Sequence, residues 1–137
     1  MTEADIQTFV TRFEQAWSSR RDEDFVAIWH PDDRLVYPFA SRVIRGDELP
    51  LLNAITKQNA PDLKWKLVDW TYRKNTVVVE WESSNIYGGH EVVWRGVAKM
   101  TLRDGKIVEE VVYADTAPFQ AMRRGETFPA LIPFPDR

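Results

Sequence analysis

A hairpin signal near the C-terminus constrains the fold of this chain more than any other stretch. Residues 91–119 read EVVWRGVAKMTLRDGKIVEEVVYADTAPF, two β-rich runs joined at Asp104-Gly105, a pair that supplies the positive φ angles of a tight turn. Along the first run, alternate residues share one face, and they are mostly apolar: Val92, Trp94, Gly96, Ala98, Met100 and Leu102. The pattern predicts two antiparallel strands with one face against a core.

The second run ends in Asp115, a carboxylate at the edge of a largely apolar strand. A charge in such a place needs a partner or a function. On one interpretation, Asp115 is a general acid or base whose pKa is raised by apolar walls. On the other, Asp115 or Thr116 caps a short last helix over residues 118–123, which the sequence Asp-Thr-Ala-Pro favours. The sequence leaves both interpretations open.

Hydrophobic periodicity predicts the helices that precede the hairpin. Apolar residues at helical spacing indicate helices over residues 3–19 and 22–29. A third helix is expected from Asp47, a good N-cap, to about residue 59. We expect Leu51, Leu52 and Ile55 on the buried side of this third helix.

The strand pattern completes the predicted fold. Residues 35–37 indicate a short strand, and residues 63–74 and 76–87 indicate two long strands before the hairpin. Helices followed by a four-stranded antiparallel meander predict an α+β fold with the helices on one face of the sheet. We expect one domain over residues 1–137, whose extended apolar tail at 125–137 lies on that domain or on a partner subunit.

Composition and charge exclude several classes of function. The chain has no cysteine and only two histidines, which argues against disulfides, thiolate metal sites and histidine-rich metal sites. The net charge is −3 with acids and bases interspersed, so no basic stripe is present for nucleic acid. No apolar run reaches membrane-spanning length, and no signal peptide is evident. We therefore expect a cytoplasmic protein without metal or cofactor that binds neither nucleic acid nor membrane.

The tryptophan content points to a pocket. Six tryptophans are more than a core of this size needs, so some are expected to line a cavity. Trp81, Ser83 and Asn85 share the core-facing side of their strand, which predicts Ser83 and Asn85 as polar groups in an apolar wall. Trp81 and Trp94 are expected as walls. Tyr113, which has the parity of the strand-end aspartate, is expected to face the same pocket.

Two further residues are candidates for the polar end of a ligand. Tyr37 ends the short first strand and could orient a carbonyl or hydroxyl group, or it could be an aromatic core residue. His90 follows Gly88-Gly89 and has the inward parity of its strand, so it could face the mouth of the cavity or be a solvated residue beside a turn. Both alternatives stay open for each residue.

Four short motifs carry a resemblance to a known family. They are Val36-Tyr37-Pro38, Arg45-Gly46-Asp47-Glu48, Asp104-Gly105-Lys106-Ile107 and Val112-Tyr113-Ala114-Asp115. With the order of elements, they resemble the SnoaL-like branch of the nuclear transport factor 2-like superfamily over residues 5–122. The resemblance implies a cone-shaped, cystatin-like α+β fold in which a curved antiparallel sheet and N-terminal helices enclose a deep apolar pocket. Members of this superfamily are commonly homodimers.

Superfamily members differ in their reactions, and this chain matches them unevenly. The two acids of a ketosteroid isomerase would fall at Tyr37 and at Ala98 or Met100, so both are missing here. Limonene epoxide hydrolase has a Tyr-x-Asp that matches residues 113–115, but its Arg-x-Asp partner is absent at residues 95–97. Scytalone dehydratase uses pocket histidines and tyrosines, for which Tyr37 and His90 are counterparts only by residue type. The fold therefore does not name the reaction.

Two functional hypotheses follow. In the first, the protein is a small cofactor-independent enzyme of the isomerase, dehydratase, cyclase or hydrolase kind that acts on an apolar small molecule. Asp115 would then move a proton while Tyr37 or His90 holds the polar end of the substrate. In the second, it is a non-catalytic module for ligand binding or dimerisation. Both hypotheses predict a homodimer, which the outward Val93 and Val97 and the apolar tail favour.

Overall fold

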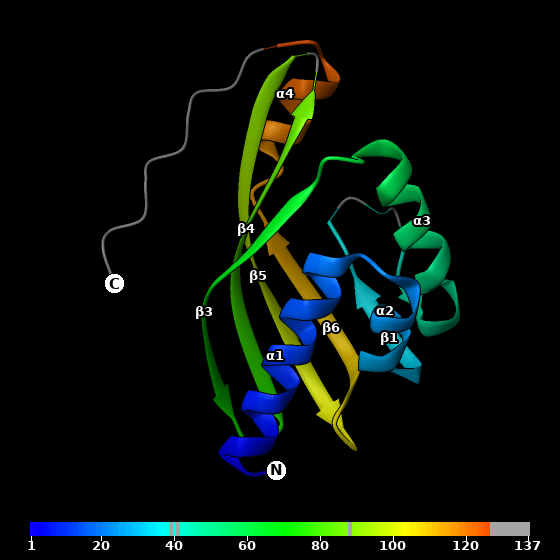
Figure 1. The fold of residues 1–137 in the computed structure, drawn as a ribbon, viewed down its shortest axis with the longest axis vertical. Helices are drawn as coiled ribbons and strands as arrows, with labels where there is room; N and C mark the ends of the chain where they lie inside the picture. The colour runs from blue at the N-terminus through cyan, green and yellow to red at the C-terminus, as the bar shows by residue number, and fades with distance from the viewer. Residues whose placement is uncertain (39, 41, 88, 127–137) are drawn as a thin grey trace.

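A curved, open sheet forms one layer of the molecule (Figure 1). The structure, a computed structural model, describes residues 1–38, 40, 42–87 and 89–126. The six strands of the sheet follow the order β2-β1-β6-β5-β4-β3. They are β1 (Trp29–Val36), β2 (Ile44–Arg45), β3 (Lys64–Arg73), β4 (Thr76–Tyr87), β5 (His90–Arg103) and β6 (Lys106–Ala114). The expected antiparallel meander is therefore present as β3 to β6, within the α+β fold that the sequence predicts.

The first strand is longer and more important than its sequence indicates. β1 begins at Trp29, where a helix was expected to end, and pairs in parallel with β6 and antiparallel with β2. The parallel pairing sets Leu35 directly opposite Glu110. The expectation of a three-residue strand was wrong because β1 gains its partners from β2 and β6, which are distant in the sequence.

Helix α1 (Glu3–Ser19) forms as its periodicity predicts. Thr2 starts it with a capping box, in which the Thr2 hydroxyl accepts the Asp5 amide and the Asp5 carboxylate accepts the Thr2 amide. The apolar stripe of α1 is buried against the inner face of the sheet: Ile6, Phe9, Val10, Phe13 and Ala16. At Arg20 the backbone takes a φ of 59° and turns directly into α2 (Asp22–Ile28).

Helix α3 (Leu49–Asn59) follows a 3-10 turn, η1 (Gly46–Glu48), and lies beside α2 at the β1 end of the sheet (Figure 1). Its buried side differs from the expected one. Leu52 is half-buried against the core as expected, but Leu51 and Ile55 are exposed, whereas Leu49 and Asn53 are buried. The prediction was wrong because the face of a short helix with apolar residues on several sides is decided by what it packs against.

The β5–β6 hairpin contains a β-bulge that the sequence pattern does not predict. Asp104 and Gly105 have φ angles of 54° and 73°, as a tight turn requires. Leu102 pairs with Ile107, but Thr101 already pairs with Glu109, so Val108 is an extra residue in β6. Every residue of β6 beyond Val108 therefore faces the opposite side from the one that an unbulged hairpin would give it.

The aromatic side chains form a cluster between the helices and the inner face of the sheet. The Trp17 ring stacks on Trp65 with centroids 6.0 Å apart and meets Phe25 edge-on at 5.1 Å. Phe13 also meets Trp65 edge-on, at 5.7 Å. Part of the high tryptophan content is therefore used in packing the core.

The C-terminal part is described only up to a short helix, α4 (Ala117–Arg123), and the three residues that follow it. The expected apolar tail falls mainly on residues 127–137, which lie outside the described residues. Among the helices that the structure describes, none has the length and apolarity needed to cross a membrane.

Gly96 offers a test of the packing in this sheet. A Cβ at residue 96 would meet the Trp81 ring and would lie 2.6 Å from the Tyr113 carbonyl oxygen. We expect Gly96→Ala to lower the free energy of unfolding by about 1–3 kcal/mol, because the Trp81 ring or the β6 backbone must shift. Urea denaturation measures the change. The exposed Lys99→Ala on the same strand is the control, and an equal effect of both substitutions would contradict the close approach.

Candidate functional site

A small cavity lies between α3, the corner that joins α1 to α2, and the β1–β6 pair. Its volume is about 20 Å³, room for about one water molecule. The lining is largely aromatic and aliphatic with a few polar groups: Trp17, Arg20, Phe25, Trp29, Leu35, Tyr37, Leu49, Leu52, Asn53, Thr56, Glu110 and Val112. Converging polar groups in an apolar cavity are typical of a ligand site.

Glu110 is the carboxyl group of this cavity. The bulge at Val108 pairs Glu110 with the buried Met100, so its side chain faces inward and is only 1% exposed. Burial raises the pKa of Glu110 well above its usual range, and the charge of Asp33 raises that pKa further. Its Oε2 has no hydrogen-bond partner. Both effects favour the neutral form of the Glu110 carboxyl group beside the cavity.

A second buried carboxyl group flanks the first. Asp33 lies two residues before Leu35 on β1, and Leu35 pairs with Glu110, so Asp33 lies roughly 7 Å along the strand from that pairing. Asp33 is 1% exposed, and neither of its carboxylate oxygens has a hydrogen-bond partner. Burial raises the pKa of Asp33 to about 7, with a smaller contribution from Glu109 that the neighbouring Arg34 opposes.

Tyr37 and Arg20 are the other ionisable groups at the cavity. Burial raises the pKa of Tyr37 to about 12, an effect that the positive charge of Arg20 opposes and the negative charge of Glu110 adds to. Burial also lowers the pKa of Arg20, whose guanidinium lies 4.9 Å from the Trp17 ring centroid and 5.2 Å from that of Phe25. Tyr37 is therefore close enough to Arg20 and to Glu110 for the charge of each to influence its ionisation.

Several polar atoms at the cavity lack a hydrogen-bond partner, although buried polar atoms in proteins are usually paired. They are Trp17 Nε1, Arg20 Nη1, Trp29 Nε1, Asn53 Oδ1 and Glu110 Oε2. Three of these atoms are donors from different elements, at the ends of α1 and α2. A ligand with acceptor oxygens would satisfy them.

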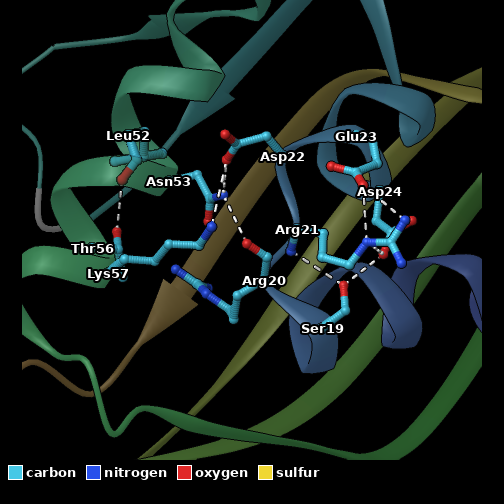
Figure 2. A network of polar contacts seen from close by, with 10 residues as sticks. All are labelled: Ser19, Arg20, Arg21, Asp22, Glu23, Asp24, Leu52, Asn53, Thr56 and Lys57. Atoms are coloured by element: carbon cyan, nitrogen blue, oxygen red, sulfur yellow. Dashed lines mark hydrogen bonds and ion pairs between the residues drawn. The ribbon is translucent and has the colours of Figure 1, made fainter.

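Helix α3 covers the cavity and is fastened to the start of α2 (Figure 2). Asn53 Nδ2 donates to Asp22 Oδ1 at 2.7 Å and to the Arg20 carbonyl oxygen at 3.2 Å. Lys57 Nζ lies 3.6 Å from the same Asp22 oxygen. These contacts hold one end of α3 against the α1–α2 corner, so a ligand larger than water requires α3 to move outward.

Comparison with known proteins places this chain in a family. The family model for the SnoaL-like domain matches residues 10–110. The chain belongs to the SnoaL-like family. No curated protein matches the sequence significantly.

Solved structures share the SnoaL-like fold over most of their length. AclR of Streptomyces galilaeus, described as a candidate hydroxylase, has a TM-score of 0.75 at 16% identity, covering 95% of this chain and 91% of its own. A candidate SnoaL-like polyketide cyclase from Jannaschia sp. CCS1 has a TM-score of 0.74 at 17% identity, with coverage of 88% and 92%. TerC, co-crystallised with polyporic acid, has a TM-score of 0.73 at 18% identity, with coverage of 88% and 98%. At such identities the likeness shows the fold alone.

Asp115 directly precedes Thr116, which is the N-cap of α4 and makes no side-chain capping hydrogen bond. Asp115 is exposed, and its Oδ1 accepts the Ala117 amide at 3.0 Å, at the start of α4. It is not among the residues that line the cavity. The catalytic role of Asp115 stays a prediction.

Tyr113 does not face inward as its strand parity predicted, whereas His90 keeps the parity of Val92 on β5. Tyr113 is 62% exposed because the extra residue Val108 reverses the faces of β6. His90 is exposed at the first position of β5. The Asp115 amide donates to the carbonyl oxygen of Arg95, which lies five residues beyond His90 on β5. His90 and Asp115 are therefore roughly 16 Å apart along the strand.

The inner face of β4 agrees with its predicted parity. Trp81, Ser83 and Asn85 are 7%, 4% and 4% exposed, and Ser83 donates to the Lys64 carbonyl oxygen at 3.2 Å. Trp94 is half-buried and packs against the core. None of these four side chains lines the cavity. Their role in substrate binding stays a prediction, whereas Tyr37 does line it.

Glu110 and Arg20 are the residues that sequence reasoning missed. Glu110 sits next to Glu109 in the hairpin, and without the bulge its parity would be that of solvent-facing Lys99. Arg20 follows the last residue of α1, where a basic side chain commonly interacts with the helix dipole. Two adjacent acids in an apolar strand were the available signal, because one of them must face inward.

The structure does not gather metal ligands. Within residues 1–38, 40, 42–87 and 89–126, no three histidine, aspartate or glutamate side chains are grouped to hold a metal ion. The polar groups of the cavity are suited to direct contact with an organic ligand.

The raised pKa of Asp33 predicts a pH-dependent stability. Its pKa rises from 3.8 in an unperturbed state to about 7, so the folded state keeps a proton that the unfolded state loses above pH 4. The free energy of unfolding should therefore fall as the pH rises from about 4 to about 7, by about 2–4 kcal/mol. Urea denaturation at several pH values measures this fall.

Asp33→Asn should reduce that fall and make the protein more stable at pH 8, with Glu110 supplying the remaining pH dependence. Asp32→Asn is the matched control, because the adjacent Asp32 side chain is 79% exposed. If Asp33→Asn keeps the full pH dependence of the wild type, Asp33 is not a buried acid in solution.

Proposed function

We propose that this protein is a small cofactor-independent acid–base enzyme, with Glu110 as the group that transfers the proton. The observation that carries the proposal is the buried Glu110 carboxyl group with an unpaired oxygen beside an aromatic cavity. A carboxylic acid whose pKa is moved toward the working pH is suited to general acid and base catalysis.

Glu110 has the surroundings that such a role requires. Buried and protonated, it can donate a proton or a hydrogen bond to a carbonyl or enol oxygen of a ligand in the cavity. Tyr37, which stays protonated because burial raises its pKa to about 12, can orient the same polar end of the ligand. The aromatic rings of Trp17, Phe25 and Trp29 would hold an apolar body. The reactions that fit are isomerisation, dehydration and cyclisation.

A substrate would enter by displacing α3. The cavity of about 20 Å³ is too small for an organic molecule while α3 lies over it. The cover is held by the buried Leu49 and, at the α1–α2 corner, by polar contacts of Asn53 and Lys57, which are few. Loss of such contacts is easier than loss of a large apolar interface, so α3 is the element that we propose as the lid.

Relatives give independent support for a ligand in this fold. TerC was co-crystallised with polyporic acid, and two further neighbours are described as a candidate hydroxylase and a candidate polyketide cyclase. We transfer from them only the chemical class, a small cyclic organic molecule, since the likeness shows the fold alone.

The second candidate function is a non-catalytic ligand-binding module. The closed cavity, with room for about one water molecule, favours it. Such a module would bind an apolar ligand without turnover and would place no demand on the protonation of Glu110.

The decisive comparison is between Glu110→Gln and Asp115→Asn. In a mass-spectrometric screen of cyclic and polyketide-like compounds, we expect Glu110→Gln to lower kcat about 100-fold or more while the dissociation constant changes little. Asp115→Asn should keep both activity and stability, because the side chain is exposed and an asparagine oxygen can also accept the amide two residues on.

The reverse result, with activity lost in Asp115→Asn and kept in Glu110→Gln, would assign catalysis to the end of β6 instead. Binding without turnover in the wild-type protein would favour the ligand-binding module. Near-native circular dichroism of each variant is required before its activity is interpreted.

We also propose that the protein forms a homodimer through the outer face of β5 and β6. Val93 and Val97 are only half-buried in the single chain, and Tyr113, which pairs with Val97, is 62% exposed. Val97 and Tyr113 join β5 and β6 in an apolar centre on this outer face, flanked by the charged Arg95 and Lys99, as a self-complementary interface with a polar rim requires.

Sedimentation velocity at micromolar concentration tests the homodimer. We expect a dimer for the wild type and a monomer for Tyr113→Arg, since an arginine there would bury a charge in the interface. Leu51→Arg, at a 63% exposed site on α3, is the matched control and should stay dimeric. A monomeric wild type would contradict the proposal.

A further inference from the structure

We propose that the ligand of this cavity is an organic acid, whose anionic oxygen pairs with the guanidinium of Arg20 and is shared with the indole N–H groups of Trp17 and Trp29. The inference deepens the proposed function because it concerns the same cavity, but it does not depend on Glu110 transferring a proton. It follows from the positive charge of Arg20 and from the buried N–H donors at the cavity, which have no partners among the described residues.

Arg20 is a cation without a counter-ion. Among the described residues its guanidinium makes no ion pair and no hydrogen bond, and its Nη1 is fully buried. The adjacent Arg21 shows the ordinary alternative, with its guanidinium 2.7 Å from the Glu23 carboxylate at the surface. The side chain of Arg20 instead leaves the α1–α2 corner in the direction of α3 (Figure 2).

The protein's own acids do not neutralise Arg20. Glu110 is buried in surroundings that favour its neutral form. Asp22, on the other side of the corner, is already engaged by Asn53 at 2.7 Å and Lys57 at 3.6 Å. The cavity is therefore positive where Arg20 faces it, and a buried cation is costly unless an anion is paired with it.

The other unpaired donors favour the same ligand. Trp17 Nε1 and Trp29 Nε1 are buried without partners, and both residues line the cavity with Arg20. An indole nitrogen can only donate, and a guanidinium can only donate, so these three groups require acceptor oxygens from the ligand. A carboxylate or an ionised enol has several lone pairs in one plane and satisfies donors from more than one direction.

The remaining walls of the cavity indicate what the rest of the ligand, beyond its acidic group, should be. The Arg20 guanidinium is held over the Trp17 and Phe25 rings, at 4.9 Å and 5.2 Å from their centroids, which restricts it to one side of the cavity. Leu35, Leu49 and Val112 supply an apolar surface elsewhere. A ligand with an acidic group at one end and an apolar ring at the other matches this division.

The test uses two probes that share a ring and differ in charge, benzoate and benzamide. Each is titrated into ¹⁵N-labelled protein at pH 7.5 while the indole N–H signals of the tryptophans are followed by NMR, with Trp17→Phe and Trp29→Phe used to assign the signals. We expect benzoate to bind about tenfold more tightly than benzamide or better, because hydrogen bonds to charged groups are the stronger kind. The Trp17 and Trp29 signals should shift.

Variants of Arg20 separate the charge effect from ordinary burial. Arg20→Gln should remove the preference for benzoate, Arg20→Lys should keep part of it, and Arg21→Gln should leave it unchanged. The inference is overturned if benzamide binds as tightly as benzoate, if Arg20→Gln keeps the preference, if benzoate fails to bind the wild type at its solubility limit, or if only other tryptophans respond.

The same titration keeps this inference distinct from the proposed enzyme activity. Preference for benzoate in wild type and in Glu110→Gln, together with absence of turnover, would support the organic-acid ligand and refute acid–base catalysis. Turnover of neutral substrates that is independent of Arg20 would support catalysis and overturn the organic-acid ligand.

Discussion

The extra residue Val108 in β6 determines the chemistry of this domain, because it sets the face of every side chain that follows it. Opposite residues in an antiparallel pair lie on the same side of the sheet, and the bulge pairs Glu110 with the inward-facing Met100. Without it, Glu109 would take that place and Glu110 would face solvent. Glu110 therefore lies at the cavity because of this shift of one position.

Desolvation disfavours the charged form of each ionisable group near the cavity. It raises the pKa of Glu110, Asp33 and Tyr37, and it lowers that of Arg20, so each group is moved toward its neutral form. The parallel pairing of β1 with β6 causes this concentration, because it places Asp33 and Tyr37 on either side of Glu110. Such groups reduce stability, and the well-packed core between α1 and the sheet makes that reduction tolerable.

Helix α3 connects these local properties to binding. Its buried side carries polar Asn53, which fastens the helix to the α1–α2 corner while leaving its Oδ1 unpaired at the cavity. The same residue thus holds the cover closed and contributes to the lining. In the proposed function, the unpaired donors and acceptors of the interior favour exchange of water for a ligand, and α3, which also buries Leu49, must move for this exchange.

The sequence by itself determined the features that depend on near neighbours in the chain. The apolar stripe of α1, its capping box at Thr2, the turn at Asp104-Gly105 and the alternation of β4 each follow from local spacing, and the SnoaL-like family follows from motifs beside those elements. The tertiary structure alone decided that β1 pairs with β6, that α3 buries Leu49 and Asn53, and that Glu110 rather than Tyr113 faces inward. The physical reason is that a bulge, a parallel pairing and a helix face are chosen by packing against distant segments, and a shift of one residue reverses a strand without changing its local pattern.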